Sequence, residues 1–266
     1  MSLHIASAQP QAGNSIRASV SPEEWQARLD LAAAYRLGAR LGWHDLLGTH
    51  FSARVPGTTD QFLVNPFGLF FEEITASSLV KIDKDGKVLS DSPHGVNKAA
   101  DVIHGAVYAA RPDVNAILHL HSVAGVGVAA QKDGLLPISQ SAAIIAGRVR
   151  YYDFTGVKLD RDECRNMAAA LEDQNILILR NHGTLMAGRT IGEAFAFTVR
   201  TERAFQIQLA AQASGAPLLH IEPHYLQEAA DFGHTLYTDS SWSPGAHIEW
   251  AAFKRKIDRE DPGYAA

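Results

Sequence analysis

The apolar spacing of the chain changes from a helical period to a strand period and back, and this change constrains the fold most strongly. From 21 to 41 apolar residues recur at helical spacing, and after Gly42 they fall into short runs separated by turns, HFSARV, DQFLVN and SLVKID. Helical segments at 97–111, 122–131 and 160–171 then alternate with the strand-like runs AILHLH and NILILR. Such an alternation is typical of an α/β domain, in which helices cover a sheet.

Helix-start signals set the expected boundaries of this domain. One capping box runs from Ser21 to Glu24, and a second, from Thr190 to Glu193, opens a long helix that is expected to end near Gly215. The tail beyond it carries an apolar stripe at helical spacing, formed by Trp250, Phe253 and Ile257.

We therefore expect three parts of the chain. Residues 1–20 are expected to form a flexible arm, because they are rich in Ser, Ala, Gln and Gly. Residues 21–215 are expected to form the α/β domain. Residues 216–266 are expected to form a helical tail, packed on the domain or on a neighbouring subunit.

The composition excludes several classes of protein. With 266 residues, 46% apolar and 20% charged, the chain can bury a substantial core. Its net charge of −5 does not indicate the basic surface that binds nucleic acid or an anionic membrane. A single cysteine, Cys164, allows no intramolecular disulfide and no cysteine-based zinc site. Neither a membrane span nor a signal peptide is recognisable, so a cytoplasmic location is expected.

Three of the twelve histidines form a candidate metal site. His119 and His121 close the predicted strand AILHLH, and alternate residues of a strand point to the same face. His182 follows the other strand-like run, in the turn Asn181-His182-Gly183. Three neutral imidazoles around a divalent ion leave a coordination position open for substrate or water, as in catalytic sites. The alternative is that they are hydrogen-bonded core histidines.

Other candidate residues have less specific signals. His104 is expected on the helix face opposite the apolar stripe of 97–111, where it would line a cleft or face solvent. Glu72 and Glu73 stand beside the loop NPFGLF, where adjacent acids are usually solvated. The chain has no glycine-rich phosphate loop and no G-x-S-x-G nucleophile elbow.

The order of several segments gives the chain a family resemblance. GTHFSARVPG, NPFGLFFEEITASSLVKIDKDGKV, IHGAVYAARPDVNAILHLHS, GLLPISQ and ILRNHGTLMAG together resemble the class II aldolase/adducin family over residues 25–215. The resemblance implies a three-layer α/β/α fold with a central mixed, largely antiparallel sheet, and a homotetramer with active sites at subunit interfaces. It also implies one divalent ion per subunit, typically zinc with manganese or iron as alternatives, held by His119, His121 and His182.

The chain departs from the family pattern in three places, one of which is the tyrosine of the neighbouring subunit, whose position falls near Ser141. The acid that moves a proton in the family's sugar-phosphate aldolases falls at Ala100. Asp101, rotated by about 100° on a helix, and Glu73 are the candidate replacements. The family's paired serines for phosphate fall at Lys98 and Ala99. The resemblance therefore covers the metal ligands but not the phosphate contacts or the proton-transfer group.

The resulting hypothesis is a divalent-metal-dependent lyase. It would cleave a carbon–carbon bond in, or decarboxylate, a small non-phosphorylated oxo or hydroxy acid, with the ion stabilising a developing enolate. The candidate catalytic residues are Glu73, His104 and Gln140. The candidate substrate contacts are Lys98, Asn65 and Gly68, with Arg111 as another cation for a carboxylate.

Two alternatives belong to different functional classes. A non-haem iron oxygenase could use the same fold and histidines. A non-catalytic module similar to the actin-binding adducin head would need no metal ligands, and the intact histidine set argues against it.

Overall fold

The computed structural model describes residues 16–90, 92–157 and 160–266. The arm predicted at 1–20 therefore lies largely outside the described residues, and the division into arm, domain and tail stays a prediction. Among the described residues, no helix has both the length and the apolar character needed to cross a membrane.

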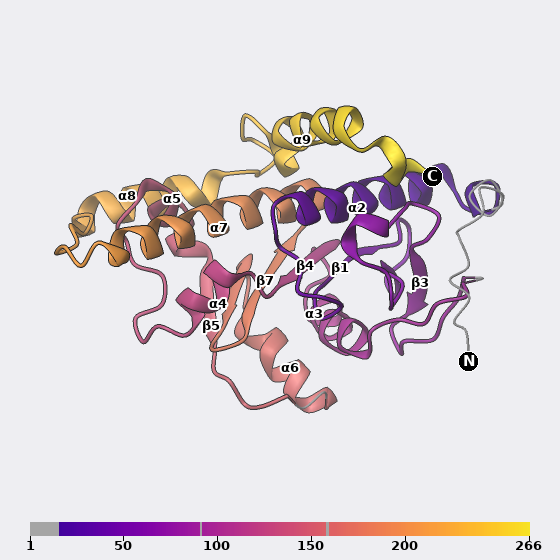
Figure 1. Ribbon diagram of the computed structural model, residues 1–266, viewed down its shortest axis with the longest axis horizontal. Coiled ribbons are helices and arrows are strands. Elements are labelled where there is room, and N and C mark those ends of the chain that lie inside the picture. The colour runs from indigo at the N-terminus through magenta and orange to yellow at the C-terminus, as the bar shows by residue number, and fades with distance from the viewer. Residues whose placement is uncertain (1–15, 91, 158–159) are drawn as a thin grey trace.

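A seven-stranded sheet lies at the centre of the fold (Figure 1). The strands are β1 (His50–Arg54), β2 (Gln61–Val64), β3 (Val80–Asp83), β4 (Ala116–Leu120), β5 (Val149–Tyr152), β6 (Ile176–Leu179) and β7 (Gly183–Gly188). Their order in the sheet is β3-β2-β1-β4-β7-β6-β5, which places β4 in the middle. Only β5 and β6 pair in parallel, so the predicted mixed, largely antiparallel sheet is confirmed.

Helices cover both faces of the sheet (Figure 1). One face carries α2 (Pro22–Arg40), α4 (Val123–Ala129), α5 (Gln140–Ile145) and α7 (Ile191–Ala213), with α8 (Pro223–Thr235) packed on α5 and α9 (His247–Glu260) packed on α7. The other face carries a π-helical turn (Ala100–His104), α3 (Gly105–Ala110) and α6 (Arg161–Ala170). Short 3-10 turns complete the structure: η1 (Phe71–Glu73), η3 (Ala146–Arg148), η4 (Pro244–Ala246) and η5 (Pro262–Ala265). The predicted three-layer architecture is confirmed.

The helix starts and the tail stripe have direct physical causes. Ser21 caps α2 by accepting a hydrogen bond from the Glu24 amide at 3.1 Å, as the first capping box predicted. In the tail, the rings of Trp250 and Phe253 pack on Phe195 of α7, with ring centroids 5.5 and 5.0 Å away. The apolar stripe of the tail therefore covers the outer side of α7.

The two faces of the central strands differ in chemistry. In β4, Ala116, Leu118 and Leu120 face the core beneath α2 and α7, and the residues between them face α3 and α6. His119 points to this second side, together with Ile117. The alternation thus gives one purely apolar face and one face on which polar side chains gather near the strand end.

The prediction of which face of the 97–111 helix is buried was wrong. The π-helical turn shifts the register, and the buried positions are Ala100, Ile103, His104, Val107 and Tyr108. His104 is therefore buried against the sheet, with 2% of its surface exposed, and does not lie opposite the apolar face. π-helical turns of this kind are frequent at functional sites.

Candidate metal centre

Three histidines converge where the central strands of the sheet end. His119 belongs to β4, His121 follows its end, and His182 lies in the turn that joins β6 to β7. Because β4 and β7 are antiparallel neighbours, with Leu120 opposite Thr184, the end of one strand meets the start of the other. The candidate ligand atoms all lie within 4.8 Å of one another.

The hydrogen bonds behind the rings fix which nitrogens face inward. His119 Nδ1 lies 2.9 Å from the Thr184 carbonyl oxygen, which can only accept, so this nitrogen carries the hydrogen. His121 Nδ1 donates in the same way to the Asp45 carboxylate at 3.1 Å. The Nε2 atom of each neutral ring is therefore left with a free lone pair.

The lone pairs of His119 and His121 face each other, and the Nε2 atom of His182 lies beside them. His121 Nε2 lies 2.9 Å from His119 Nε2 and 3.0 Å from His182 Nε2. Lone pairs at such distances repel unless a cation lies among them, and outer carboxylate and carbonyl partners are the usual support of metal-binding histidines. The three residues thus fit a divalent ion, and imidazole donors suit zinc and other borderline metals.

Burial keeps two of the rings neutral, which is the form that binds metal. It lowers the pKa of His119 well below the ordinary value, and the neighbouring His50, His182 and His121 lower it further. Burial, with a smaller contribution from His121, lowers the pKa of His182 to about 4. Protons therefore compete weakly with a metal ion for these two rings.

A tight turn places His182. Asn181 has a left-handed backbone with φ of 57°, and a Cβ on Gly183 would lie 2.2 Å from the Leu120 carbonyl oxygen. Only glycine allows the backbone after His182 to approach β4 this closely. The turn Asn181-His182-Gly183 is thus a steric requirement of the site.

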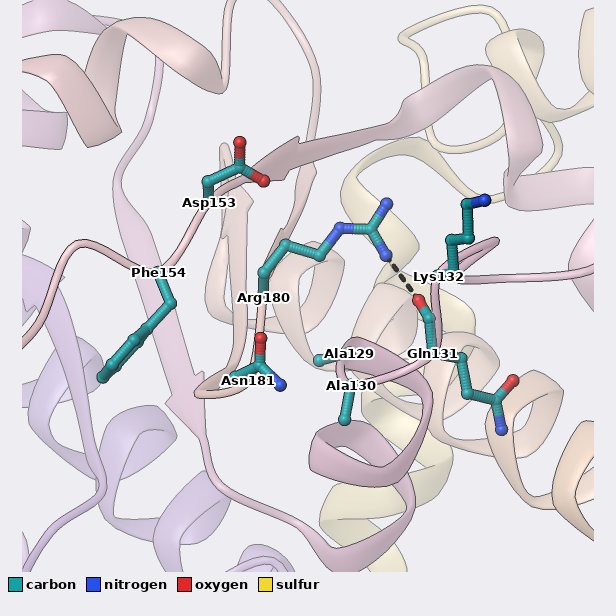
Figure 2. A pocket seen from close by; sticks show the side chains of 8 residues that line it. All are labelled: Ala129, Ala130, Gln131, Lys132, Asp153, Phe154, Arg180 and Asn181. Carbon is teal, nitrogen blue, oxygen red and sulfur yellow. Dashed lines mark hydrogen bonds between the residues drawn. The ribbon is translucent and has the colours of Figure 1, made fainter.

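A pocket of about 490 Å³ adjoins this turn (Figure 2). It is lined by Ala129, Ala130, Gln131, Lys132, Asp153, Phe154, Arg180 and Asn181. Arg180 lies across the Tyr151 ring and donates a 2.7 Å hydrogen bond to the Gln131 carbonyl oxygen. The pocket therefore presents two cationic side chains, Arg180 and Lys132, beside the loop that carries His182.

Two of the predicted site residues are buried, His104 on the face covered by α3 and α6 and Asn65 on the face covered by α2. His104 Nε2 lies 3.0 Å from His50 Nδ1, and His50 is opposite His119 in the β1–β4 ladder. Asn65 is buried and accepts a 2.8 Å hydrogen bond from Tyr35. The location of His104 does not test its predicted catalytic role, and that of Asn65 does not test its predicted contact with the substrate.

The other predicted residues lie at the surface. Gly68 is exposed with φ of 104°, and Lys98 and Gln140 are exposed at the starts of helices. Glu73 is exposed in η1 and accepts a 2.8 Å hydrogen bond from the Phe70 amide. Within the described part of the chain, no hydrogen bond joins these four residues to the three histidines, so their predicted roles stay untested.

Two charged candidates are displaced from the metal centre. The Asp101 carboxylate packs on Gly86 in the turn after β3, at the sheet edge and three strands from β4. Arg111 precedes the far end of β4, pairs with Asp113 at 2.7 Å and donates to the Gln174 carbonyl oxygen. Neither side chain contacts the three histidines within the described part of the chain, and the roles predicted for Asp101 and Arg111 stay untested.

The sequence gives no signal for Asp45, and it places His50 beside a loop from which it could reach a substrate, with no specific role. Asp45 lies 76 residues before its partner His121, on a loop without any motif, so no sequence signal could have connected the two. His50 could have been found from its pairing with His119, but only once the strand register was known.

Comparison with known proteins agrees with this geometry. The family described as the class II aldolase and adducin N-terminal domain matches residues 29–209. A Pseudomonas aeruginosa protein named as a candidate class 2 aldolase is 47% identical, over 94% of this chain and 95% of its own length. Alpha-adducin of Rattus norvegicus is 42% identical over 87% of this chain, which corresponds to 33% of that longer protein.

A solved structure has a similar fold. The L-fuculose 1-phosphate aldolase of Glaciozyma antarctica has a TM-score of 0.79 and 28% identity, with 92% of this chain and 93% of that one covered. The family match and the fold similarity thus cover the same part of the chain. The chain belongs to the class II aldolase and adducin family.

Proposed function

We propose that the chain is a divalent-metal-dependent lyase for a small oxo or hydroxy acid that carries no phosphate. The reaction would break a carbon–carbon bond next to a carbonyl or carboxylate, by aldol-type cleavage or by decarboxylation. The single observation that supports it most is the convergence of three imidazole Nε2 atoms, each on a ring that strand geometry or a tight turn holds in place.

The chemistry follows from the nitrogen donors. A divalent ion in this position acts as a Lewis acid on a substrate oxygen and stabilises the negative charge that develops as the bond breaks. The chain's own contribution is to hold the rings in one tautomer, through the Thr184 carbonyl and the Asp45 carboxylate. We propose zinc as the ion, with manganese or iron as alternatives, and a homotetramer as the assembly.

The absence of phosphate from the substrate is supported by the helix before β4. Ala100, at the position of the family acid, is 2% exposed and lies in the apolar cluster between this helix and the sheet. Lys98 and Ala99 replace the paired serines that would hold a phosphate. The similarity to the L-fuculose 1-phosphate aldolase is a similarity of fold, and we propose a different substrate for this chain.

Metal content and a substrate screen test the proposal. The protein is purified untagged without added metal, its metal content is measured by mass spectrometry, and the zinc-loaded form is screened for aldehyde or carbon dioxide release. We expect about one ion per chain and turnover of an oxo or hydroxy acid, with no turnover of L-fuculose 1-phosphate. A chain without metal after reconstitution would refute the proposal, and equal turnover of the sugar phosphate would refute its substrate class.

A second candidate is a non-catalytic binding module. The 42% identity to alpha-adducin favours it, because the match covers most of this chain. The same measurement separates the candidates, since such a module needs no metal. Iron at one ion per chain, with oxygen consumption, would instead point to the oxygenase.

A further inference from the structure

A buried histidine beside the metal centre has an unused nitrogen. His50 lies directly opposite His119 in the β1–β4 ladder, and their ring centroids are 5.0 Å apart. His50 is 1% exposed, and in the described chain its Nε2 atom has no hydrogen-bond partner. Buried polar atoms are nearly always paired, so an unpaired one beside a candidate site calls for a ligand.

A chain of hydrogen bonds leads away from the other side of this ring. His50 Nδ1 lies 3.0 Å from His104 Nε2, and His104 Nδ1 lies 2.6 Å from Ser52 Oγ. Ser52 Oγ lies in turn 2.8 Å from the Tyr108 hydroxyl. All four side chains are buried, and they come from β1, the π-helical turn and α3.

The two directions of this chain differ in how many buried groups they leave unpaired. If Tyr108 donates to Ser52, then Ser52 donates to His104 Nδ1, and His104 Nε2 donates to His50 Nδ1, so the hydrogen of His50 lies on Nε2. Among the described residues, this direction leaves one buried group, His50 Nε2–H, without an acceptor. In the reverse direction, the Tyr108 hydroxyl hydrogen has no acceptor and the His50 Nε2 lone pair has no donor among the described residues. The first direction therefore leaves fewer buried groups unpaired, and an oxygen atom of a bound ligand would complete it.

We propose that His50 Nε2–H is a fixed hydrogen-bond donor to a carboxylate or carbonyl oxygen of the substrate at the metal centre. His104, Ser52 and Tyr108 act as positioning residues, because they set the tautomer of His50 without touching the substrate. The inference rests on the proposed function, and it adds a specific contact for an oxygen-rich acid.

Two measurements on the zinc-loaded protein test it. Oxalate serves as the probe, because it offers carboxylate oxygens to both a divalent ion and a nearby donor, and its affinity is measured by calorimetry. Separately, long-range ¹H–¹⁵N spectra of protein with labelled histidine read the tautomer of His50. We expect Nε2 to carry the hydrogen in the wild type, and Ser52→Ala to yield a mixture of tautomers.

For the calorimetry, His50→Ala should weaken oxalate binding about ten- to a hundredfold, as expected for one charge-assisted hydrogen bond, while zinc stays at one per chain. His50→Gln, whose amide can donate, should recover part of the affinity, and the exposed His220→Ala is the matched control. Unchanged oxalate affinity in His50→Ala, or a wild-type ring with its hydrogen on Nδ1, would overturn the inference alone. A wild type that binds no zinc would overturn the proposed function, and the inference with it.

Discussion

The Ser122 hydroxyl donates a 2.7 Å hydrogen bond to the Glu202 carboxylate, directly behind the metal centre. Ser122 follows His121 in the chain and caps α4 by accepting from the Gly125 amide at 2.9 Å. Glu202 belongs to α7 and is 3% exposed. Burial, opposed only in part by the Ser122 hydrogen bond, raises the pKa of Glu202 to about 7.

This relationship predicts a pH-dependent effect of Glu202→Gln on stability. The folded chain binds the Glu202 proton more tightly than the unfolded chain, in which the pKa is about 4.5, so wild-type stability falls as pH rises through the window from 4.5 to about 7. Glutamine lacks this penalty and can still accept from Ser122. We expect the free energy of unfolding of the variant, relative to that of the wild type, to increase by on the order of 2 kcal/mol from pH 5 to pH 8. The measurement is urea unfolding with a chelator present. A difference independent of pH would contradict the prediction.

Replacing a ligand histidine should remove the metal but keep the fold. His119→Ala and His182→Ala each leave two imidazoles, which bind a divalent ion far more weakly than three. We expect metal content to fall at least about tenfold, with a near-native circular dichroism spectrum. His220→Ala, at an exposed position, should retain full metal content. Full stoichiometry in the two ligand variants would show that the site is assigned wrongly.

The turn glycine should be irreplaceable for a steric reason. In Gly183→Ala the new Cβ would lie 2.2 Å from the Leu120 carbonyl oxygen and 3.0 Å from His121, so β4 and the turn must separate. We expect a loss of about 2 kcal/mol or more in unfolding free energy together with weakened metal binding. Gly95→Ala, where a Cβ meets no atom within 4 Å, is the control and should change neither quantity. Equal behaviour of the two variants would refute the steric argument.

A buried ion pair should dominate the stability of the α2 layer. Arg28 is fully buried, pairs with Glu24 at 3.0 Å and donates to the Leu79 carbonyl oxygen at 2.8 Å. Arg28→Ala leaves the Leu79 carbonyl oxygen without its donor and leaves Glu24 with Lys81, at 2.8 Å, as its remaining cation, so we expect a loss of about 3 kcal/mol by chemical denaturation. The exposed Arg165, paired with Asp162, is the comparison, and Arg165→Ala should cost less than about 1 kcal/mol. A small loss in Arg28→Ala would mean that water or Lys81 replaces the guanidinium.

Local patterns predicted the elements well, because each depends on near neighbours in the chain. Ser21 begins α2, and the runs around His119 and at 176–179 form strands, as their spacing predicted. The helix before β4 is the exception. Its π-helical turn buries His104, and this register depends on packing against Ser52 of another strand.

That His119 and His121 share a face and that His182 follows a second strand can be predicted from the amino-acid sequence, because these relations are set within a few residues. The surroundings of the three histidines depend on long-range contacts. The antiparallel register of β1 with β4 brings His50 opposite His119, and a loop 76 residues away supplies Asp45. Such contacts depend on which strands become neighbours, a choice made by burial of the whole sheet and not by any local preference.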